Sequence, residues 1–357
     1  MADRVRWGVL GAANIARRKV IPAIMASSNG VVVAIASRDR ERGQAVATEL
    51  GIARVHVGYE ALLADPEVEA IYNPLPNSLH AEWTIRAAEA GKAVLCEKPL
   101  ARDAAQAASM VSACARHKVP LMEAFMYRFH PQNARVRALI AQGAIGEVGA
   151  VRAGFGFRMD LLNPANVRLK GDLAGGALMD VGCYAVNASR MLFDAEPVAA
   201  MAWRDYDERF GVDVALAGVL EYPAHSAGAG PRFATIDCSF KAGYSGWYTV
   251  VGSAGTIEVP RAYTPQGDDT VIVITDEQNR RREERIPGVD QYRLMVEAFA
   301  EAVLAGAPVP CPPDDAVRDM RAIDALARAA ASGSAQRVDR RWAMGDGRWL
   351  ESTMADT

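Results

Sequence analysis

A lysine in a stiff turn is the residue of this chain whose position points most directly to chemistry. Lys98 lies in Glu97-Lys98-Pro99, directly after the apolar stretch Ala93–Cys96. If that stretch is a strand of a parallel sheet, its carboxyl end lies where open α/β sheets bind ligands. Pro99 fixes its own φ and disfavours helical geometry at the residue before it, so the ammonium projects from a stiffened turn. Such a turn suits a cation held against a cofactor and a substrate. Taken alone, it is equally typical of a surface lysine at a strand end.

Asp180 and Tyr184 form a second candidate set. They are four positions apart, so on a helix they share one face. A phenol has a pKa of about 10, and an adjacent ammonium favours its ionised form. Lys98 could supply that charge, so that Tyr184 takes a proton from a reacting hydroxyl while Asp180 orients Lys98 or a substrate hydroxyl. Taken alone, the pair is equally typical of a capping aspartate and a core tyrosine.

The N-terminal strand leads into a turn that suits a dinucleotide. Val5–Leu10 is followed by Gly11-Ala12-Ala13-Asn14-Ile15-Ala16 and then by a helical pattern. This is the dinucleotide-binding turn with alanine in place of its second and third glycines. Small residues let the helix N-terminus approach a pyrophosphate, although the methyl group of Ala13 lies at the point of closest approach. We expect cofactor contacts from Gly11, Ala12, Ala13, Asn14 and Ile15.

The end of the second predicted strand bears on the choice of cofactor. An acidic residue there selects NAD, whereas a cation accommodates the 2′-phosphate of NADP. The strand ends at Ser37 and is followed by Arg38, Asp39 and Arg42. Ser37 can donate a hydrogen bond, and Arg38 and Arg42 can bind a phosphate. The sequence therefore favours NADP. Asp39 keeps NAD open, and a solvated helix start capped by Ser37 or Asp39 is the alternative.

A proline-containing loop and two arginines complete the candidate site. The loop Pro74-Leu75-Pro76-Asn77 and His80 follow the strand Ala70–Asn73, which places them at the same edge of the predicted sheet. We expect Pro74, Leu75, Asn77, His80 and Glu97 to contact the cofactor. His80 is a weaker candidate for an acid or base, and the alternative is a loop that only caps the next helix. Arg128 and Arg168 could bind substrate or cofactor, or form an ion pair between domains. No metal-ligand spacing occurs.

The elements around these residues predict an α/β chain of two domains. Up to residue 124, apolar β-branched stretches alternate with helical patterns, which is typical of a doubly wound parallel sheet. Beyond it, period-two alternation indicates a mainly antiparallel sheet with one face free. The predicted domains are therefore 1–124 and 125–357, the second being α+β. The predicted strands are Val5–Leu10, Val31–Ser37, Arg54–Val57, Ala70–Asn73, Ala93–Cys96, Pro120–Glu123, Val148–Phe157, Val198–Trp203, Asp213–Tyr222, Phe233–Phe240, Gly246–Gly252, Thr256–Pro260 and Thr270–Thr275.

The composition argues against several classes of protein. A chain of 357 residues, half of them hydrophobic, can bury about two cores. The net charge of -3 gives no basic face for nucleic acid or membrane lipid. No apolar run is long enough for a membrane span, and the first residues show no apolar export signal. The five cysteines are scattered, which argues against a disulfide framework and a structural zinc. We expect a cytoplasmic protein.

Together these segments resemble the glucose–fructose oxidoreductase/inositol dehydrogenase (Gfo/Idh/MocA) superfamily. The matching pieces are Gly11–Ala16, Pro74–His80, Gly91–Pro99 and Gly175–Tyr184, in the family's order. The resemblance implies an N-terminal Rossmann domain, a C-terminal domain with a large open sheet, and NAD(P)-dependent chemistry on sugars or related polyols. Many members carry a histidine where this chain has Tyr184.

The tyrosine, together with Glu123–Pro131 and Asn166–Leu169, resembles a narrower branch of that superfamily. The branch contains NADP-dependent D-xylose 1-dehydrogenases, dimeric dihydrodiol dehydrogenases and glucose–fructose oxidoreductase itself. We therefore expect an NADP-dependent dehydrogenase that takes hydride from the anomeric hydroxyl of an aldose such as D-xylose and gives a lactone. Tyr184 would be the base and Lys98 would tune it.

Three alternatives remain open at this point. A trans-dihydrodiol dehydrogenase needs a more apolar pocket. A keto-sugar reductase runs the same chemistry in reverse and needs cations for a diphosphate. A non-catalytic NADP-binding regulator needs the nucleotide turn but not the proton-transfer set. In each case a broad open sheet can bury its free face against another subunit, so we expect a homodimer or homotetramer formed through the C-terminal sheet.

Overall fold

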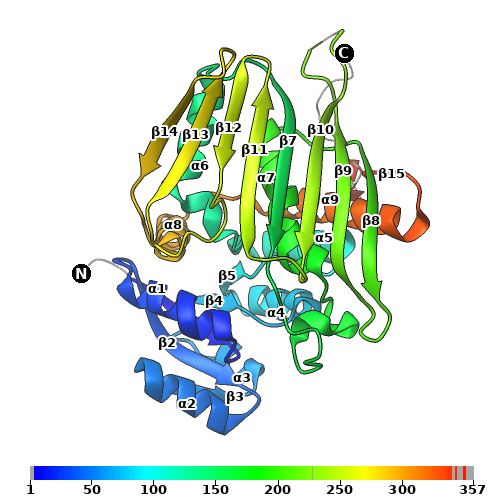
Figure 1. The fold of residues 1–357 in the computed structure, drawn as a ribbon. Helices are drawn as coiled ribbons and strands as arrows, with labels where there is room; N and C mark the ends of the chain where they lie inside the picture. Colours follow the sequence, from blue (N-terminus) through cyan, green and yellow to red (C-terminus); the bar gives the residue numbers. More distant parts are fainter. Residues whose placement is uncertain (1–3, 227, 340–341, 344–348, 351–357) are drawn as a thin grey trace. The chain divides into compact units, whose positions relative to one another are not determined.

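The computed structural model describes residues 4–226, 228–339, 342–343 and 349–350 of the chain. The chain divides into two compact units, one of Met1–Phe129 with Asp290–Val317 and one of His130–Val289 with Arg318–Thr357. Figure 1 shows the course of the chain through both. This division differs from the predicted boundary at residue 124 in two ways. The first unit extends to Phe129, and a later segment returns to it.

The first unit is built on a six-stranded sheet with the order β3-β2-β1-β4-β5-β6, in which every neighbouring pair is parallel. Its central strands β4 and β5 are buried at every position, as expected of a parallel sheet covered on both faces. The strands predicted for this region are confirmed to within one residue at each end. They are β1 (Val5–Leu10), β2 (Gly30–Ser37), β3 (Arg54–Val57), β4 (Ala70–Asn73), β5 (Ala93–Cys96) and β6 (Leu121–Glu123).

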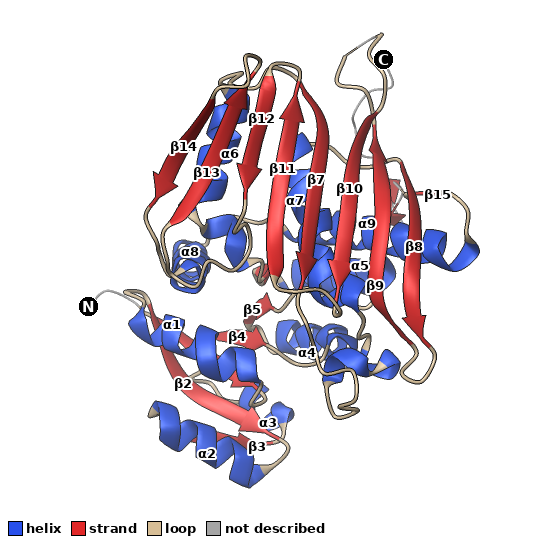
Figure 2. Cartoon of the chain, viewed as in Figure 1, coloured by secondary structure: helices blue, strands red, loops and turns tan. Residues whose placement is uncertain are grey.

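Helices with ordinary capping signals connect these strands. Asp39 and Asp103 accept hydrogen bonds from the backbone N–H groups of Arg42 and Gln106, and so cap α2 and α5. In Figure 2, α1 and α2 lie on opposite sides of β2, which gives the doubly wound arrangement. The helices are α1 (Ile21–Ala26), which continues a π-helical segment at Ala16–Val20, α2 (Arg40–Leu50), α3 (Tyr59–Leu63), α4 (Asn77–Glu89), α5 (Ala104–His117) and a 3-10 turn at Met126–Phe129.

Helix α8 (Gln291–Ala305) belongs to the first unit although it comes late in the chain. The ring of Phe299 lies 5.3 Å from that of Trp7 in β1. Asn29 donates a hydrogen bond from Nδ2 to the backbone carbonyl of Glu297 at 2.9 Å. The helix follows the pattern in its own sequence, but the surface on which it packs lies nearly 300 positions away, and local patterns carry no information on that choice.

The second unit is built on a nine-stranded sheet with the order β14-β13-β12-β11-β7-β10-β9-β8-β15. β7 and β10 are parallel and the other neighbours are antiparallel, which confirms the predicted, mainly antiparallel sheet. The strands are β7 (Val148–Gly156), β8 (Ala199–Asp207), β9 (Val212–Tyr222), β10 (Arg232–Ser239), β11 (Ser245–Gly252), β12 (Gly255–Val259), β13 (Thr270–Asp276), β14 (Arg281–Ile286) and β15 (Gln336–Arg337); β16 (Trp342–Ala343) and β17 (Trp349–Leu350) pair separately.

One face of this sheet is covered by helices. Side chains alternate along β9, where every second residue from Val212 to Tyr222 is buried, as expected when only one face is packed. Helices α6 (Pro131–Ala141), α7 (Cys183–Phe193) and the later part of α9 (Pro313–Ser332) lie behind the sheet in Figures 1 and 2. No helix of the described residues lies on the other face in these views, which we call the open face.

Candidate active site

The phosphate-binding turn forms at the end of β1. Gly11 has a φ of +77°, and a β-carbon there would lie 3.1 Å from Leu75 Cδ2, so glycine is required both for the conformation and for the space. Helical structure begins at Asn14, and the N–H groups of a first helical turn have no partner within the helix. Ala12, Ala13 and Ile15 are half-buried and Asn14 is exposed. These features fit a bound diphosphate.

At the end of β2, Asp39 has the capping function that the sequence left open. Its carboxylate accepts from Arg42 N, while Ser37 Oγ accepts from Asp39 N at 3.2 Å. Arg38 is exposed, and Arg42 Nη2 donates to the backbone oxygen of Ala12 at 3.1 Å. The guanidinium of Arg42 therefore lies beside the phosphate-binding turn. A 2′-phosphate at this position would lie near the guanidinium groups of Arg38 and Arg42 and the hydroxyl of Ser37. The carboxylate of Asp39 repels it less than a free carboxylate would, because it already accepts a backbone hydrogen bond.

The Lys98 turn is held by two carboxylates. Glu97 Oε2 accepts from Lys98 N at 3.3 Å, and Glu123 Oε1 accepts from Leu100 N at 2.7 Å. The Lys98–Pro99 peptide bond is cis. Tyr72, fully buried on β4, donates its hydroxyl to Glu97 Oε1 at 2.7 Å. Burial and the adjacent Glu97 raise the pKa of Tyr72 well above its ordinary value, so Tyr72 is a hydrogen-bond donor to the turn and not a base.

His80 lies inside the first unit. Its side chain has no exposed surface, and its two ring nitrogens face backbone carbonyls, with Nε2 2.8 Å from Leu75 O and Nδ1 3.0 Å from Pro99 O. Burial lowers its pKa. The cofactor contact and the acid–base function considered for His80 both require an accessible ring nitrogen, and here both nitrogens have protein partners instead.

The other residues of the loop that follows β4 lie at the carboxyl edge of the first unit's sheet, as predicted. Pro74 and Leu75 are buried, and Leu75 packs under Gly11. Asn77 is half-buried at the start of α4. The structure therefore brings Gly11, Leu75 and Asn77 to the carboxyl edge of one sheet, together with Lys98 at the end of the neighbouring strand β5.

In the second unit, Arg168, Asp180 and Tyr184 lie close together. Arg168 Nε donates to Asp180 Oδ2 at 2.6 Å, and Asp180 raises the pKa of Arg168 against the opposing effect of burial, with a further contribution from Tyr184. Asp180 belongs to the π-helical segment Leu178–Gly182, which continues as α7 and carries Tyr184 in its first turn. The proposed proton-transfer residues of this unit thus lie on one helical stretch.

A glycine turn places this helical stretch against the Arg168 loop. Gly176, with a φ of +112°, donates from its N–H to the carbonyl of Arg168 at 2.9 Å. A β-carbon at Gly175 would lie only 2.4 Å from the same carbonyl oxygen, so a side chain there would separate the two segments. At the other side of the turn, the carboxylate of Asp213 accepts from Leu178 N at 2.7 Å. The turn fixes the distance from Arg168 to Asp180.

Aromatic rings enclose the ring of Tyr184, which is 5% exposed. The rings of Phe155 and Tyr263 each lie 5.3 Å from it, and Tyr244 continues the cluster at 6.1 Å from Phe155. Sequence patterns did not predict a site function for these three residues or for Tyr72. Tyr72 could have been predicted to take part in a buried hydrogen bond, because it lies within an apolar strand and a buried tyrosine hydroxyl needs a partner.

Arg128 has an ion-pair partner within the first unit. It belongs to the first unit and forms an ion pair with Asp315, in the first turn of α9. This pairing lies within one compact unit and accounts for the charge of Arg128 without a ligand. Its assignment to the substrate stays a prediction.

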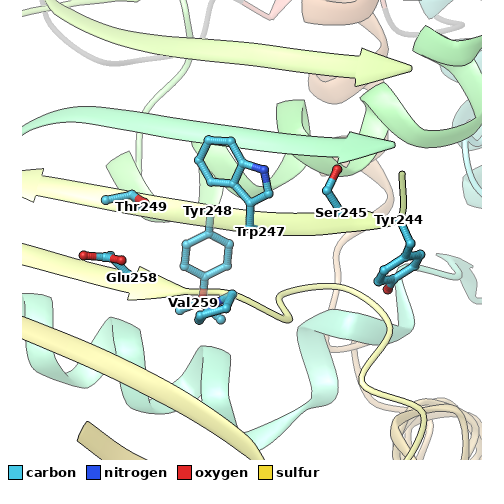
Figure 3. Close-up of a pocket in the computed structure, with 8 residues that line it drawn as sticks. Tyr244, Ser245, Trp247, Tyr248, Thr249, Glu258 and Val259 are labelled. Carbon is cyan, nitrogen blue, oxygen red and sulfur yellow. The ribbon is translucent and has the colours of Figure 1, made fainter. Parts of the chain in front are cut away.

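The second unit also contains a shallow pocket apart from these residues. Tyr244, Ser245, Trp247, Thr249 and Glu258 are among the residues that line a pocket of about 360 Å³. Figure 3 shows their side chains along β11 and β12. None of the residues predicted to be catalytic or cofactor-binding lines it. Thr249 and Glu258 are paired across β11 and β12, so their side chains lie on the same face of the sheet. The pocket is therefore a depression in the surface of the sheet.

Within the described part of the chain, no three His, Cys, Asp or Glu side chains form a cluster that could hold a metal ion. The same part contains no helix long and apolar enough to cross a membrane. All five cysteines are buried and none forms a disulfide.

The geometry agrees with the families that the chain matches. Residues 5–125 match the model of an oxidoreductase family with an NAD-binding Rossmann fold, and residues 133–258 match the GFO/IDH/MocA C-terminal domain. A D-xylose 1-dehydrogenase (NADP(+)) from Haloferax volcanii is 42% identical over 335 residues, covering 93% of this chain and 99% of the relative. A trans-1,2-dihydrobenzene-1,2-diol dehydrogenase from Xenopus tropicalis is 32% identical, covering 71% of this chain and 75% of the relative.

Among solved structures, a 3-ketoreductase from Actinomadura kijaniata in complex with NADP and TDP-benzene has a TM-score of 0.84 and 32% identity, covering 92% of this chain and 98% of the other. The family models together cover more than half of the chain, and each of the three relatives has an oxidoreductase name. This protein belongs to the Gfo/Idh/MocA family of oxidoreductases.

Proposed function

We propose that this protein is an NADP-dependent dehydrogenase that oxidises the anomeric hydroxyl of an aldose such as D-xylose to a lactone. The observation that carries the proposal is the end-to-end similarity to the D-xylose 1-dehydrogenase at 42% identity. The cofactor is NADP, which the relatives' names include and which the Ser37, Arg38 and Arg42 side chains at the end of β2 suit. Asp39 is engaged as a helix cap, which weakens the case for NAD.

The residues divide the reaction between them. The Gly11 turn and the Arg38 and Arg42 side chains would hold NADP⁺, which would supply the acceptor for the hydride of the anomeric carbon. Tyr184 takes the proton of the anomeric hydroxyl, so the C–H and O–H bonds break as the C=O bond of the lactone forms. The ammonium of Lys98, at the end of β5, favours negative charge on the reacting oxygen. Asp180, held by Arg168, accepts from a neighbouring sugar hydroxyl.

Two other functions are each favoured by a specific observation. The aromatic rings of Phe155, Tyr244 and Tyr263 near Tyr184 suit an apolar ring, as a dihydrodiol dehydrogenase needs. The similarity to the 3-ketoreductase favours a keto-sugar reductase, in which Tyr184 gives up its proton as hydride arrives.

Nicotinamide reduction by the purified protein separates these functions. The substrates are D-xylose, D-glucose and a trans-cyclohexadienediol, each with NADP⁺ and with NAD⁺; oxidation of NADPH by a nucleotide-linked keto-sugar is followed in parallel. Aldose oxidation that is lost in Lys98→Met and Tyr184→Phe supports the proposal. Turnover of the diol alone or of the keto-sugar alone contradicts it in favour of that alternative. NADP binding without turnover of any substrate indicates a regulator.

We also propose that two copies associate through the open face. The register places Trp247, Gly154, Asp237, Ala217 and Trp203 side by side in one row across five strands. Trp203 is 63% exposed, and Gly154 and Ala217 in the same row have little or no side chain. The exposed Arg152 lies in the next row from the exposed Asp237. A two-fold interface pairs each patch with itself, so the exposed indole of each copy can pack on the small residues of the other while Arg152 meets Asp237.

The oligomeric state tests this second proposal. Sedimentation of the wild type is compared with Trp203→Lys and with Glu283→Lys, an exposed change on the edge strand β14. We expect a dimer or tetramer that only Trp203→Lys dissociates. A wild-type monomer, or an oligomer that resists Trp203→Lys combined with Arg152→Glu, overturns it.

A further inference from the structure

We propose that His80 is a positioning residue that ties the Lys98 turn to the loop 74–77 at the carboxyl edge of the first unit's sheet. The inference rests on the function proposed above, because it gives His80 a task in holding the residues assigned to catalysis and cofactor binding. The imidazole lies between the two segments, 3.0 Å from Pro99 O through Nδ1 and 2.8 Å from Leu75 O through Nε2.

On one side, His80 supports the end of the Lys98 turn. The backbone N–H groups of Lys98 and Leu100 already have carboxylate acceptors in Glu97 and Glu123. The carbonyl of Pro99, between them, faces the imidazole. Because Pro99 directly follows Lys98, a displacement of this carbonyl shifts the backbone from which the ammonium projects.

On the other side, His80 supports the segment beneath the phosphate-binding turn. Leu75 N donates to Asn73 Oδ1 at 3.3 Å, and Asn73 Nδ2 in turn donates to the carbonyl of His80 at 3.3 Å. The side chain of Leu75 fills the space under Gly11. Loss of the contact to Leu75 O therefore loosens the loop on which the Gly11 turn rests.

The two contacts compete for one proton. Burial lowers the pKa of His80 although its hydrogen bonds to backbone carbonyls raise it, and the net shift is downward, so the imidazole is mainly neutral at neutral pH. A neutral imidazole has a single N–H, and only one carbonyl receives it at a time. Two substitutions of His80 separate the contacts. In His80→Asn, the amide nitrogen takes the place of the imidazole Nδ1 and still donates to the carbonyl of Pro99. In His80→Gln, the amide nitrogen takes the place of the imidazole Nε2 and still donates to the carbonyl of Leu75.

The experiment compares His80→Asn with His80→Gln. We expect His80→Gln to lower kcat by about tenfold with KM for NADP near the wild-type value, because misplacing a catalytic group costs rate. His80→Asn should keep kcat within about threefold and weaken NADP binding by about tenfold, the size of one lost hydrogen bond with its unsatisfied partner. The control is His56→Asn, which removes a hydrogen bond to Asp65 at 2.9 Å on β3 and lowers stability away from the Lys98 turn.

The outcomes that would overturn the inference are equally specific. If both His80 variants lose kcat equally and in proportion to their loss of Tm, as His56→Asn would, His80 is only a core residue. If the wild type turns over none of the substrates, the proposed function fails, but NADP dissociation constants still test His80. Equal NADP affinity in the Asn and Gln variants would then contradict the link to the loop 74–77.

Discussion

Arg168 holds the carboxylate of Asp180 through a short hydrogen bond, with Arg168 Nε 2.6 Å from Asp180 Oδ2, at the beginning of the helical stretch that carries Tyr184. The Asp180 side chain is 15% exposed and that of Arg168 is 43% exposed. The pair is therefore shielded at its acidic end and open to solvent at its basic end. A guanidinium in this position can hold the carboxylate and still offer donors to a ligand.

Arg168→Met should lower kcat/KM by about tenfold or more, because it removes a charge-assisted hydrogen bond to a largely buried carboxylate. Arg168→Lys should recover only part of the loss, since lysine restores the charge but not the planar donor group. Steady-state kinetics with the best aldose measures both. The matched control is Arg285→Met, which breaks a pair with Asp269 in the same unit that is exposed at both ends. Equal effects of the Arg168 and Arg285 substitutions would refute a function for the Arg168–Asp180 pair.

Tyr184→Phe should lower kcat by about 10²- to 10⁴-fold, the usual contribution of a positioned acid or base. The ring packing on Phe155 and Tyr263 is retained, so the free energy of unfolding should change by less than about 1 kcal/mol. Tyr263→Phe is the control, because burial raises the pKa of Tyr263 well above its ordinary value and makes it unsuitable as a base. Activity kept in Tyr184→Phe, or lost equally in both variants, would exclude Tyr184 as the base.

The double variant Lys98→Met with Tyr184→Phe tests whether the two residues serve the same step. Groups that act as a unit are not additive, so the double variant should be about as slow as the slower single variant. Initial rates at saturating NADP⁺ give the three values. If the fold-loss in rate of the double variant equals the product of the two single fold-losses, Lys98 and Tyr184 act independently.

Arg38→Ala should raise KM for NADP by about tenfold to hundredfold, the value of one charge-assisted hydrogen bond to phosphate. KM for NAD should stay nearly unchanged, because that cofactor has no 2′-phosphate. Arg40→Ala is the control, since Arg40 is also exposed at the start of α2. A parallel loss with both cofactors would place Arg38 away from the 2′-phosphate.

Stability should fall as pH falls through the unfolded-state pKa of histidine. Burial lowers the native pKa of both His80 and His130, so below about pH 6.5 the unfolded chain binds protons that the native state does not. Each histidine should then cost up to about 1.4 kcal/mol per pH unit until its native pKa is reached. Urea unfolding between about pH 5 and about pH 8 measures the slope.

His130→Asn provides the comparison for this pH dependence. Asparagine can still cap α6, where His130 now accepts from Gln132 N, but it does not titrate. The variant should therefore show a shallower slope than the wild type. An unchanged slope would mean that His130 does not contribute.

The sequence by itself determined the local elements and their chemistry. The six strands of the first sheet, the turn at Gly11 and the Glu97-Lys98-Pro99 turn follow from apolar runs, a required positive φ and a proline. The alternation along β9 likewise indicated a sheet with one free face. These features can be read from the sequence because helix and strand periodicity, capping and turn preferences act over a few neighbouring residues.

Only the tertiary structure decided which distant groups meet. The partner of Asp180 is Arg168, twelve positions earlier and across two turns, where the sequence left Arg168 a choice of several partners. His80 faces two carbonyls of the interior instead of a ligand, and α8 packs on the first unit rather than the second. Hydrophobic burial is non-directional, so an apolar helix face or a polar side chain does not specify its partner. The partner is chosen only when the whole chain finds the packing that satisfies its buried polar groups together.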